Sequence, residues 1–179
     1  MSADAPAANG RSLVREADLT GPDAIEVGAA VRAYLEQTER EKRQLDQGAA
    51  LDGAVALPDR YLPEIDDPAA AYAGHRVLVA QLGDRIVGVV VLAVRDRIAE
   101  VKRLWAAPAV RGRGVGSALL DAAVRAASGL GASEVRLSVW DWREGAVRLY
   151  ESRGFARVPS WDDRARLVCM VRPLAVGPT

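Results

Sequence analysis

The sequence contains few of the residues that build disulfides and metal sites. Among its 179 residues are one cysteine, Cys169, and one histidine, His75. A single cysteine excludes an internal disulfide and a cysteine-based zinc site, and a single histidine argues against a histidine-rich metal centre. We therefore expect no metal. We also expect Cys169, which lies in an apolar segment, to be an unreactive core residue.

An excess of charge and a long apolar run are also missing. The 24 lysines and arginines balance 24 acidic residues, so the chain as a whole has no electrostatic attraction for nucleic acid or an anionic membrane. The longest apolar stretch, 86–94, is interrupted by Gly88 and is too short to span a bilayer. The first ten residues, MSADAPAANG, lack the basic and apolar parts of a signal peptide. We expect a cytoplasmic protein with neither a nucleic acid nor a membrane as partner.

The remaining composition is typical of one globular domain. Apolar residues make up 50% of the chain and charged residues 27%, and the length suffices for a single self-supporting core. The Ala- and Pro-rich residues 1–10 predict a disordered tail, residues 11–174 a single domain, and residues 175–179 a short second tail. A monomer and a homodimer are both compatible with this sequence.

The order of the apolar patterns predicts a mixed α/β fold. A helical stripe runs from Asp23 to about residue 47, and strand-like segments dominate from residue 76 to residue 106. The complete predicted order is β-α-α-β-β-β-α-β-α-β. Between this helix and the first of these strands, the proline-containing stretch 48–68 predicts an irregular loop, which is either functional or mobile.

A basic, glycine-rich turn between a strand and a helix is the most informative feature. The turn alternates three glycines: Gly112, Gly114 and Gly116. Glycines allow a tight bend and the close approach of a ligand, and the free amides at the start of the following helix favour an anion. Arg111 and Arg113 add positive charge. A diphosphate cradle and a plain glycine-rich turn both fit these residues alone.

Two nucleotide-binding motifs do not match this turn. A triphosphate-binding P-loop requires a lysine after the glycines, and none is present. A dinucleotide-binding fold requires an acidic residue at the end of the next strand, whereas Glu134 stands at its beginning. A nucleotide-binding module is therefore disfavoured.

Two elements together resemble the GCN5-related N-acetyltransferases, the GNAT family. Arg111-x-x-Gly114-x-Gly116 resembles the family's acyl-CoA-binding loop, [Q/R]-x-x-G-x-[G/A]. About thirty residues later, AVRLYESRGF (146–155) resembles the family's A-x-x-L-Y-x-x-x-G-F element. Their order and spacing make the combination specific.

Three further positions extend or qualify the resemblance. Residues 104–108, LWAAP, correspond to the family's L-x-V-x-P, with alanine in place of valine, and residues 169–174 resemble its closing strand. Arg143 stands where the family often has an asparagine that fixes the pantetheine arm. We therefore expect the family's pantetheine contact to differ here in detail.

The resemblance implies a fold and a reaction. The fold would be a single-domain mixed, mostly antiparallel sheet with helices on both faces and with strands that splay at the cofactor site. The reaction would transfer an acetyl group from acetyl-CoA, as co-substrate, directly to a primary amine of a small molecule or peptide. The implied acetyl-CoA-binding residues are Leu104, Trp105, Ala106, Arg111, Gly112, Arg113, Gly114, Val115, Gly116, Ser117, Arg143, Ala146, Tyr150 and Arg153.

The resemblance also implies catalytic roles. Tyr150 occupies the position of the acid that protonates the departing thiolate, and a backbone amide near residues 104–106 would stabilise the carbonyl oxygen. Glu100 lies at the spacing of the catalytic glutamate of histone-type members, with Asp141 acting through water, or water alone, as alternatives. In a regular strand Glu100 shares the face of Leu104 and not that of Trp105.

The acceptor site is expected to be built from the first helix, the irregular loop 48–68 and the strand ends. Its polar and aromatic candidates are Tyr34, Glu36, Tyr61, Glu64, Asp66, Asp67 and Tyr72. Acidic residues among them would suit a cationic amine, and Trp140 and Trp142 would either line the pocket or pack on the sheet. A non-catalytic domain of the same fold that binds or senses acyl-CoA is the alternative to an enzyme.

Overall fold

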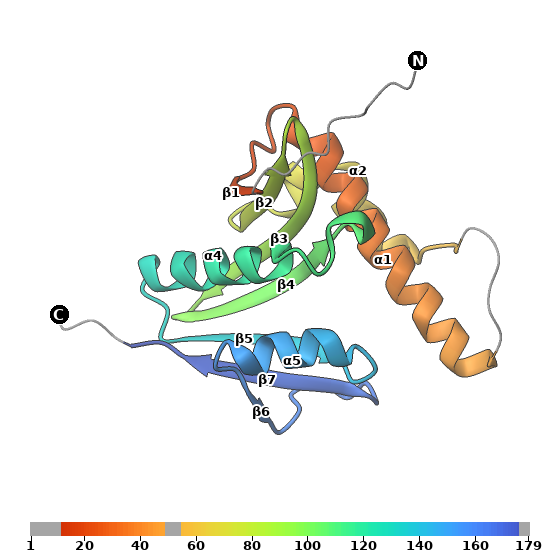
Figure 1. The fold of residues 1–179 in the computed structure, drawn as a ribbon, viewed down its shortest axis with the longest axis vertical. Helices are drawn as coiled ribbons and strands as arrows, with labels where there is room; N and C mark the ends of the chain where they lie inside the picture. Colours follow the sequence, from red (N-terminus) through yellow and green to blue (C-terminus); the bar gives the residue numbers. More distant parts are fainter. Residues whose placement is uncertain (1–11, 49–54, 176–179) are drawn as a thin grey trace, which may run out of the picture.

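The computed structural model describes residues 12–48 and 55–175 (Figure 1). They form one seven-stranded sheet with the strand order β1-β2-β3-β4-β5-β7-β6. The tails expected at 1–10 and 175–179 lie outside the described residues, apart from Ala175. The mixed, mostly antiparallel α/β fold that the sequence predicts is confirmed.

The sheet is antiparallel except for one central pair. Its strands are β1 (Leu13–Glu16), β2 (Arg76–Leu82), β3 (Arg85–Arg95), β4 (Ile98–Ala106), β5 (Glu134–Trp140), β6 (Ala156–Val158) and β7 (Leu167–Pro173). Only β4 and β5 are parallel neighbours among these strands. A parallel pair needs a crossover, and the helix between the two strands supplies it.

Helices cover both faces of this sheet. They are α1 (Asp23–Gln47), α2 (Leu62–Asp66), α3 (Pro68–Ala71), α4 (Val115–Gly129) and α5 (Glu144–Ser152), with short 3-10 turns η1 (Asp59–Tyr61) and η2 (Pro108–Val110). One core joins β3 to α1, α2 and Tyr72, which directly follows α3, and the other joins it to α4 and α5. None of the helices in the described segments has the length and apolar character needed to cross a membrane.

The central strand β3 is buried on both sides, as its valine-rich run predicts. Val89 and Val91 pack toward α1, whereas Val90 and Leu92 pack toward α4, and all four are fully buried. Gly88, next to them, leaves room for α4, because an added Cβ would lie 2.8 Å from Leu119 Cδ1. The strand therefore anchors the helices of both faces.

A bulge changes the phase of β4. The pairing with β3 shifts register between Val89 and Val91, and Arg103 has a left-handed φ of 54°. Val101 packs in the α4 core, and so does Leu104, three residues later rather than two. Such a bulge leaves one residue unpaired and bends the strand.

Beyond the bulge, β4 and β5 part. Their parallel pairing covers three positions and ends at Glu100 and Arg136, although both strands continue past this point. Figure 1 shows the two strands diverging toward the side of the molecule where α1 lies. The splay that the family resemblance implies is thus present.

The structure differs from the predicted element order in two places. Residues 59–66, expected to be irregular, form η1 and α2, with a proline in the first turn of α2, a position that suits its fixed φ. Gly28 of α1 makes this packing possible, because an added Cβ would lie 2.3 Å from the carbonyl oxygen of Ile65. The three-residue β6 is too short to show an apolar period in the sequence.

Candidate active site

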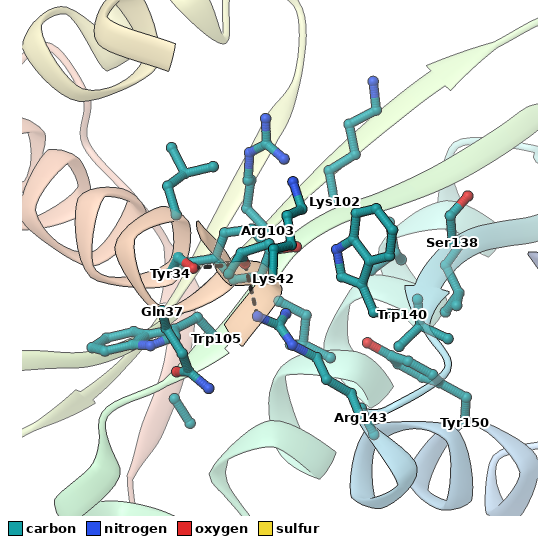
Figure 2. A pocket seen from close by; sticks show the side chains of 18 of the residues that line it. Tyr34, Gln37, Lys42, Lys102, Arg103, Trp105, Ser138, Trp140, Arg143 and Tyr150 are labelled. Carbon is teal, nitrogen blue, oxygen red and sulfur yellow. Dashed lines mark hydrogen bonds between the residues drawn. The ribbon is translucent and has the colours of Figure 1, made fainter. Parts of the chain in front are cut away.

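The gap between β4 and β5 opens into a cavity of about 620 Å³. Residues of both strands line it, together with side chains from α1, η1, α5 and the β6–β7 loop. Figure 2 shows these side chains converging on a common space. Trp105, Tyr150 and Arg143, all predicted to bind the cofactor, meet in this lining.

The edge of β4 presents free backbone groups to the gap. The amide of Ala107 donates to the carbonyl of Val87 on β3 at 2.8 Å. In an antiparallel ladder, alternate residues bond to the partner strand, and Ala106 lies in the regular part of the pairing, so its amide turns away from β3 and toward the gap. This amide can donate to an acyl group or an extended amide chain lying there.

A second group of free amides lies at the start of α4. Gly112 and Gly114 have φ values of 73° and 82°, and an added Cβ at either would meet nothing within 4 Å. The amide of Ala118 donates to Gly114 at 2.9 Å, so the three preceding helical amides, 115–117, have no partner within the helix. They and the helix dipole favour an anion in the open space above the turn.

The arginines near this turn differ in how firmly they are held. Arg111 donates to the carbonyl of Ala106 at 3.1 Å and to Gln37 at 2.6 Å, which ties the turn to β4 and α1. Arg153 donates to Asp121 of α4 at 2.9 Å. Arg113 is exposed beside the turn. Arg148 pairs with Glu144 on the exposed face of α5 and does not line the cavity.

Tyr150 is buried beneath the cavity and contributes to its lining. It is 7% exposed, and its ring packs edge-on against Phe155, with centroids 5.9 Å apart. Figure 2 shows the hydroxyl directed toward the side where the Arg143 guanidinium lies. Burial raises the pKa of this phenol above its ordinary value, and Tyr34 adds to the effect. Tyr150 therefore keeps its proton at neutral pH.

Arg143 links the start of α5 to α1. Its guanidinium donates to Glu41 at 2.8 Å and to the Thr38 hydroxyl at 2.7 Å, and it lies 5.3 Å from the ring centroid of Tyr34. Burial raises the pKa of Glu41, but hydrogen bonds from Trp142 and Gln37 and the charge of Arg143 outweigh this and lower it. Arg143, at the position where the resemblance implies an asparagine, thus fastens α1 to the start of α5 across the cavity.

Glu100 lies on the α1 face of the sheet. Its carboxylate is 3.6 Å from Lys102 Nζ and 4.0 Å from the Arg136 guanidinium. Because of the bulge, Glu100 shares its face with Trp105 and not with Leu104, so the face expected for a regular strand is wrong. Glu100 lines the cavity, whereas Asp141 pairs with Arg166 at 3.1 Å and does not.

The acidic candidates for the acceptor site do not line the cavity that the described residues form. Of the seven candidates, only Tyr34 and Tyr61 line the cavity. Glu64 lies outside the lining, where it accepts two hydrogen bonds of 2.7 Å from Arg103 and one of 2.7 Å from Tyr72. The remaining candidates, Glu36, Asp66, Asp67 and Tyr72, lie outside the lining.

Sequence reasoning missed several basic residues that line the cavity. They are Lys42, Arg60, Lys102, Arg103 and Arg164. Lys42 belongs to a run of charges that resembles an ordinary solvated helix face, and the bulge that turns Arg103 inward leaves no mark in the residue pattern. Trp140 lines the cavity and stacks on Trp142, with centroids 4.7 Å apart.

The two residues singled out by their rarity lie apart from this site. His75 contacts the carbonyl of Ala73 at 3.2 Å and packs against Tyr72, and Cys169 is buried within the sheet. Within 12–48 and 55–175, no group of three His, Cys, Asp or Glu side chains could hold a metal ion.

Comparison with known proteins gives a family and a fold. A family model described as the acetyltransferase (GNAT) family matches residues 35–155. An acetyltransferase from Streptococcus agalactiae superposes with a TM-score of 0.69 at 16% identity, covering 91% of this chain and 98% of that one. No curated protein sequence matches the chain.

Two further solved structures have more specific descriptions. The ribosomal-protein-S18-alanine N-acetyltransferase from Escherichia coli gives a TM-score of 0.62 at 18% identity, covering 93% of this chain and 96% of that one. The PaiA N-acetyltransferase from Thermoplasma acidophilum, in complex with coenzyme A, gives 0.62 at 16% identity, covering 91% and 99%. At such identities the likeness shows the fold.

The partly buried ion pair between Glu64 and Arg103 gives a pH-dependent prediction. Glu64→Gln should lower the free energy of unfolding by about 1–3 kcal/mol at neutral pH, because Arg103 loses its carboxylate partner. Burial raises the pKa of Glu64, but Arg103 and Tyr72 lower it further than burial raises it. The contribution is therefore complete above the ordinary carboxyl pKa of about 4.3 and is lost as the pH falls through the lowered value.

Denaturant unfolding of wild type and variant, followed from neutral pH to well below the ordinary carboxyl pKa of about 4.3, measures this difference. Glu144→Gln is the control, because Glu144 forms an exposed pair with Arg148 and should change stability by less than about 0.5 kcal/mol. A Glu64→Gln effect that stayed constant with pH would contradict the ionic contribution.

Proposed function

The chain belongs to the GNAT family of acetyltransferases, and we propose that it transfers an acetyl group from acetyl-CoA to a primary amine of a small molecule or peptide. The observation that carries this proposal is the meeting of three features at one cavity. The free edge of β4, the buried Tyr150 and the turn before α4 all border the gap between β4 and β5.

The residues present fit acetyl-CoA, which supplies an activated acetyl thioester when bound. The three free amides of 115–117 and the open space above Gly112 and Gly114 suit its diphosphate, and Arg113 adds charge there. The turned-out amide of Ala106 suits its amide-containing arm or its acyl oxygen. This fit supports binding of the diphosphate at α4 and of the acyl end in the gap.

Acyl transfer makes three demands on the chain. The nitrogen of the acceptor must lose a proton to attack the acyl carbon, and the new C–N bond forms as the C–S bond breaks. The acyl oxygen gains negative charge, for which an amide of β4 is a donor. The departing sulfur takes a proton, and Tyr150, which keeps its hydroxyl proton at neutral pH, is the donor within the lining.

Glu100 is our choice for the group that receives the amine proton. Among the described residues that line the cavity it is the one acidic side chain. Asp141, the other candidate, is occupied by Arg166 outside the lining. Glu100 would act directly or through a water, and the proton it takes leaves the acceptor nitrogen as the C–N bond forms.

The turn before α4 is tested by a charge placed inside it. Gly114→Asp should abolish acetyl-CoA binding, because the side chain would occupy the open space above the free amides and repel the diphosphate. The control is Gly131→Asp at the other end of α4, which has a similar φ of 76° and equally open surroundings. Titration calorimetry measures both, and unchanged affinity in Gly114→Asp would overturn the loop assignment.

Tyr150 is tested by removing its hydroxyl alone. Tyr150→Phe should lower kcat by about 10²-fold while the affinity for acetyl-CoA changes little, because the ring and its packing on Phe155 remain. Tyr72→Phe is the control, since the Tyr72 hydroxyl donates to Glu64 and neither residue lines the cavity. Thiol release gives kcat, and equal turnover by wild type and Tyr150→Phe would remove this residue from the mechanism.

The choice of base is tested by two isosteric changes. Glu100→Gln should lower kcat/KM by about 10²-fold or more, because the proton acceptor is lost without a change of shape. Asp141→Asn should leave kcat/KM close to wild type. The reverse order would assign the base to Asp141, and two unimpaired variants would leave proton removal to water. Tight acetyl-CoA binding without thiol release for any amine would favour the non-catalytic binding domain.

A further inference from the structure

The cavity concentrates positive charge in a chain that is neutral overall. The whole sequence has 24 basic and 24 acidic residues, yet the described lining has seven basic side chains against Glu100 alone. Arg111 belongs to the turn before α4. The other six form what we call the basic wall: Lys42, Arg60, Lys102, Arg103, Arg143 and Arg164. Both lysines of the sequence, Lys42 and Lys102, are among them.

Carboxylates behind the basic wall hold several of its cations in place. Glu64 binds Arg103, Glu41 binds Arg143 and Glu39 binds Lys42 at 2.7 Å, and these three carboxylates do not line the cavity. In the described hydrogen bonds, Arg103 and Arg143 each use only part of their five N–H donors. The cations therefore face the cavity with donors to spare.

Aromatic rings between the cations add rigidity. The Arg103 guanidinium lies 5.7 Å from the ring centroids of both Tyr34 and Tyr61, and Lys42 Nζ lies 4.9 Å from that of Trp140. Such contacts orient a cation without neutralising it. Figure 2 shows Lys42, Arg103 and Arg143 on the side of the space that faces Trp140 and Tyr150.

The position of the basic wall separates it from the proposed diphosphate site. Arg103 contacts Glu64 of α2 and the rings of Tyr34 and Tyr61, which all belong to the α1 face of the sheet. The turn before α4 leads into the helix that packs on the opposite face. A cofactor whose diphosphate is held at α4 enters the gap from the α4 face of the sheet. The basic wall, on the α1 face, is then available to bind the acceptor.

We propose that the acceptor is a small amine that carries a carboxylate or phosphate group, and that the basic wall binds this group. The inference rests on the acetyltransferase function proposed above. A cavity of about 620 Å³ that must also admit the acyl end of the cofactor suits a small molecule. Arginine forks match both oxyanion types, so the shared chemistry is a compact oxyanion close to the amine.

The basic wall also favours the reactive form of the acceptor. Five of its six cations pair with carboxylates, and Arg60 has no partner among the described ion pairs. The charge of Arg60 disfavours an ammonium nearby and stabilises the neutral amine, which is the form that attacks. The basic wall thus attracts the anionic end of the acceptor and promotes loss of the proton from its other end. A diamine would receive no such assistance, because its second charge would be repelled.

The test compares acceptors that differ only in charge. With wild-type protein and acetyl-CoA, kcat/KM should be at least about tenfold higher for methionine than for methioninamide, or for O-phosphoethanolamine than for ethanolamine. The first comparison is stringent, because a peptide-like α-amine loses its proton near pH 8 and methioninamide is the more reactive amine in water. The pair with the larger ratio identifies the oxyanion as carboxylate or phosphate.

Variants of the basic wall supply the second arm. Lys42→Met and Arg60→Met should each raise KM for the preferred anionic acceptor by about tenfold with a smaller change in kcat. Arg125→Met is the matched control, because it removes one exposed positive charge from α4, away from the cavity. Equal or better use of neutral amines or 1,4-diaminobutane by wild type, or of a peptide amine alone, would overturn the proposal.

A binding measurement separates this inference from the proposed function. With coenzyme A present, N-acetylmethionine should slow the reaction of Lys42 and Lys102 with an amine-reactive reagent, read by mass spectrometry, and N-acetylmethioninamide should not. N-acetyl-O-phosphoethanolamine serves the phosphate arm. If the anions protect the two lysines but no acceptor is acetylated, the proposed acetyltransferase function is wrong and the anion-binding site stands. If neither anion protects the lysines, the anion-binding site is wrong, whether or not the protein acetylates an amine.

Discussion

The parting of β4 and β5 is the constraint on which the site depends. The two strands pair at three positions and then separate after Glu100 and Arg136. An open strand edge inside a sheet exposes backbone donors that would otherwise be satisfied. Here the exposed edge faces a cavity rather than another strand, and the side chains of α1 and α5 close that cavity from both faces. The gap gives an extended ligand a place to complete the sheet's hydrogen bonding.

The bulge at Arg103 links this gap to the acceptor side. A left-handed φ at a non-glycine residue is unfavourable, and contacts with Glu64, Tyr34 and Tyr61 hold the residue there. The same bulge places Glu100 and Trp105 on one face of the sheet. One irregularity in the backbone therefore places Arg103 in the basic wall and brings Trp105 to the face of the proposed base. Arg143 fastens the opposite side through Glu41 and Thr38.

The sequence predicts the secondary structure and the glycine turn of this site better than the side chains that line its cavity. The fold class, the long α1 and the glycine turn before α4 follow from periodicity and from local residue preferences, which act over a few neighbouring residues. The face of Glu100 does not follow, because the bulge arises from pairing with β3 and shifts the alternation without a residue that marks it. The basic wall is likewise invisible along the chain, since it joins residues from five segments that are distant in sequence.

A crystal structure with bound coenzyme A tests the central claim most directly. The account predicts the diphosphate on the amides of residues 115–117 and the pantetheine arm in the gap between β4 and β5. Its sulfur should then lie within hydrogen-bond reach of the Tyr150 hydroxyl. Coenzyme A bound elsewhere, with the turn before α4 empty and the gap unoccupied, would contradict it.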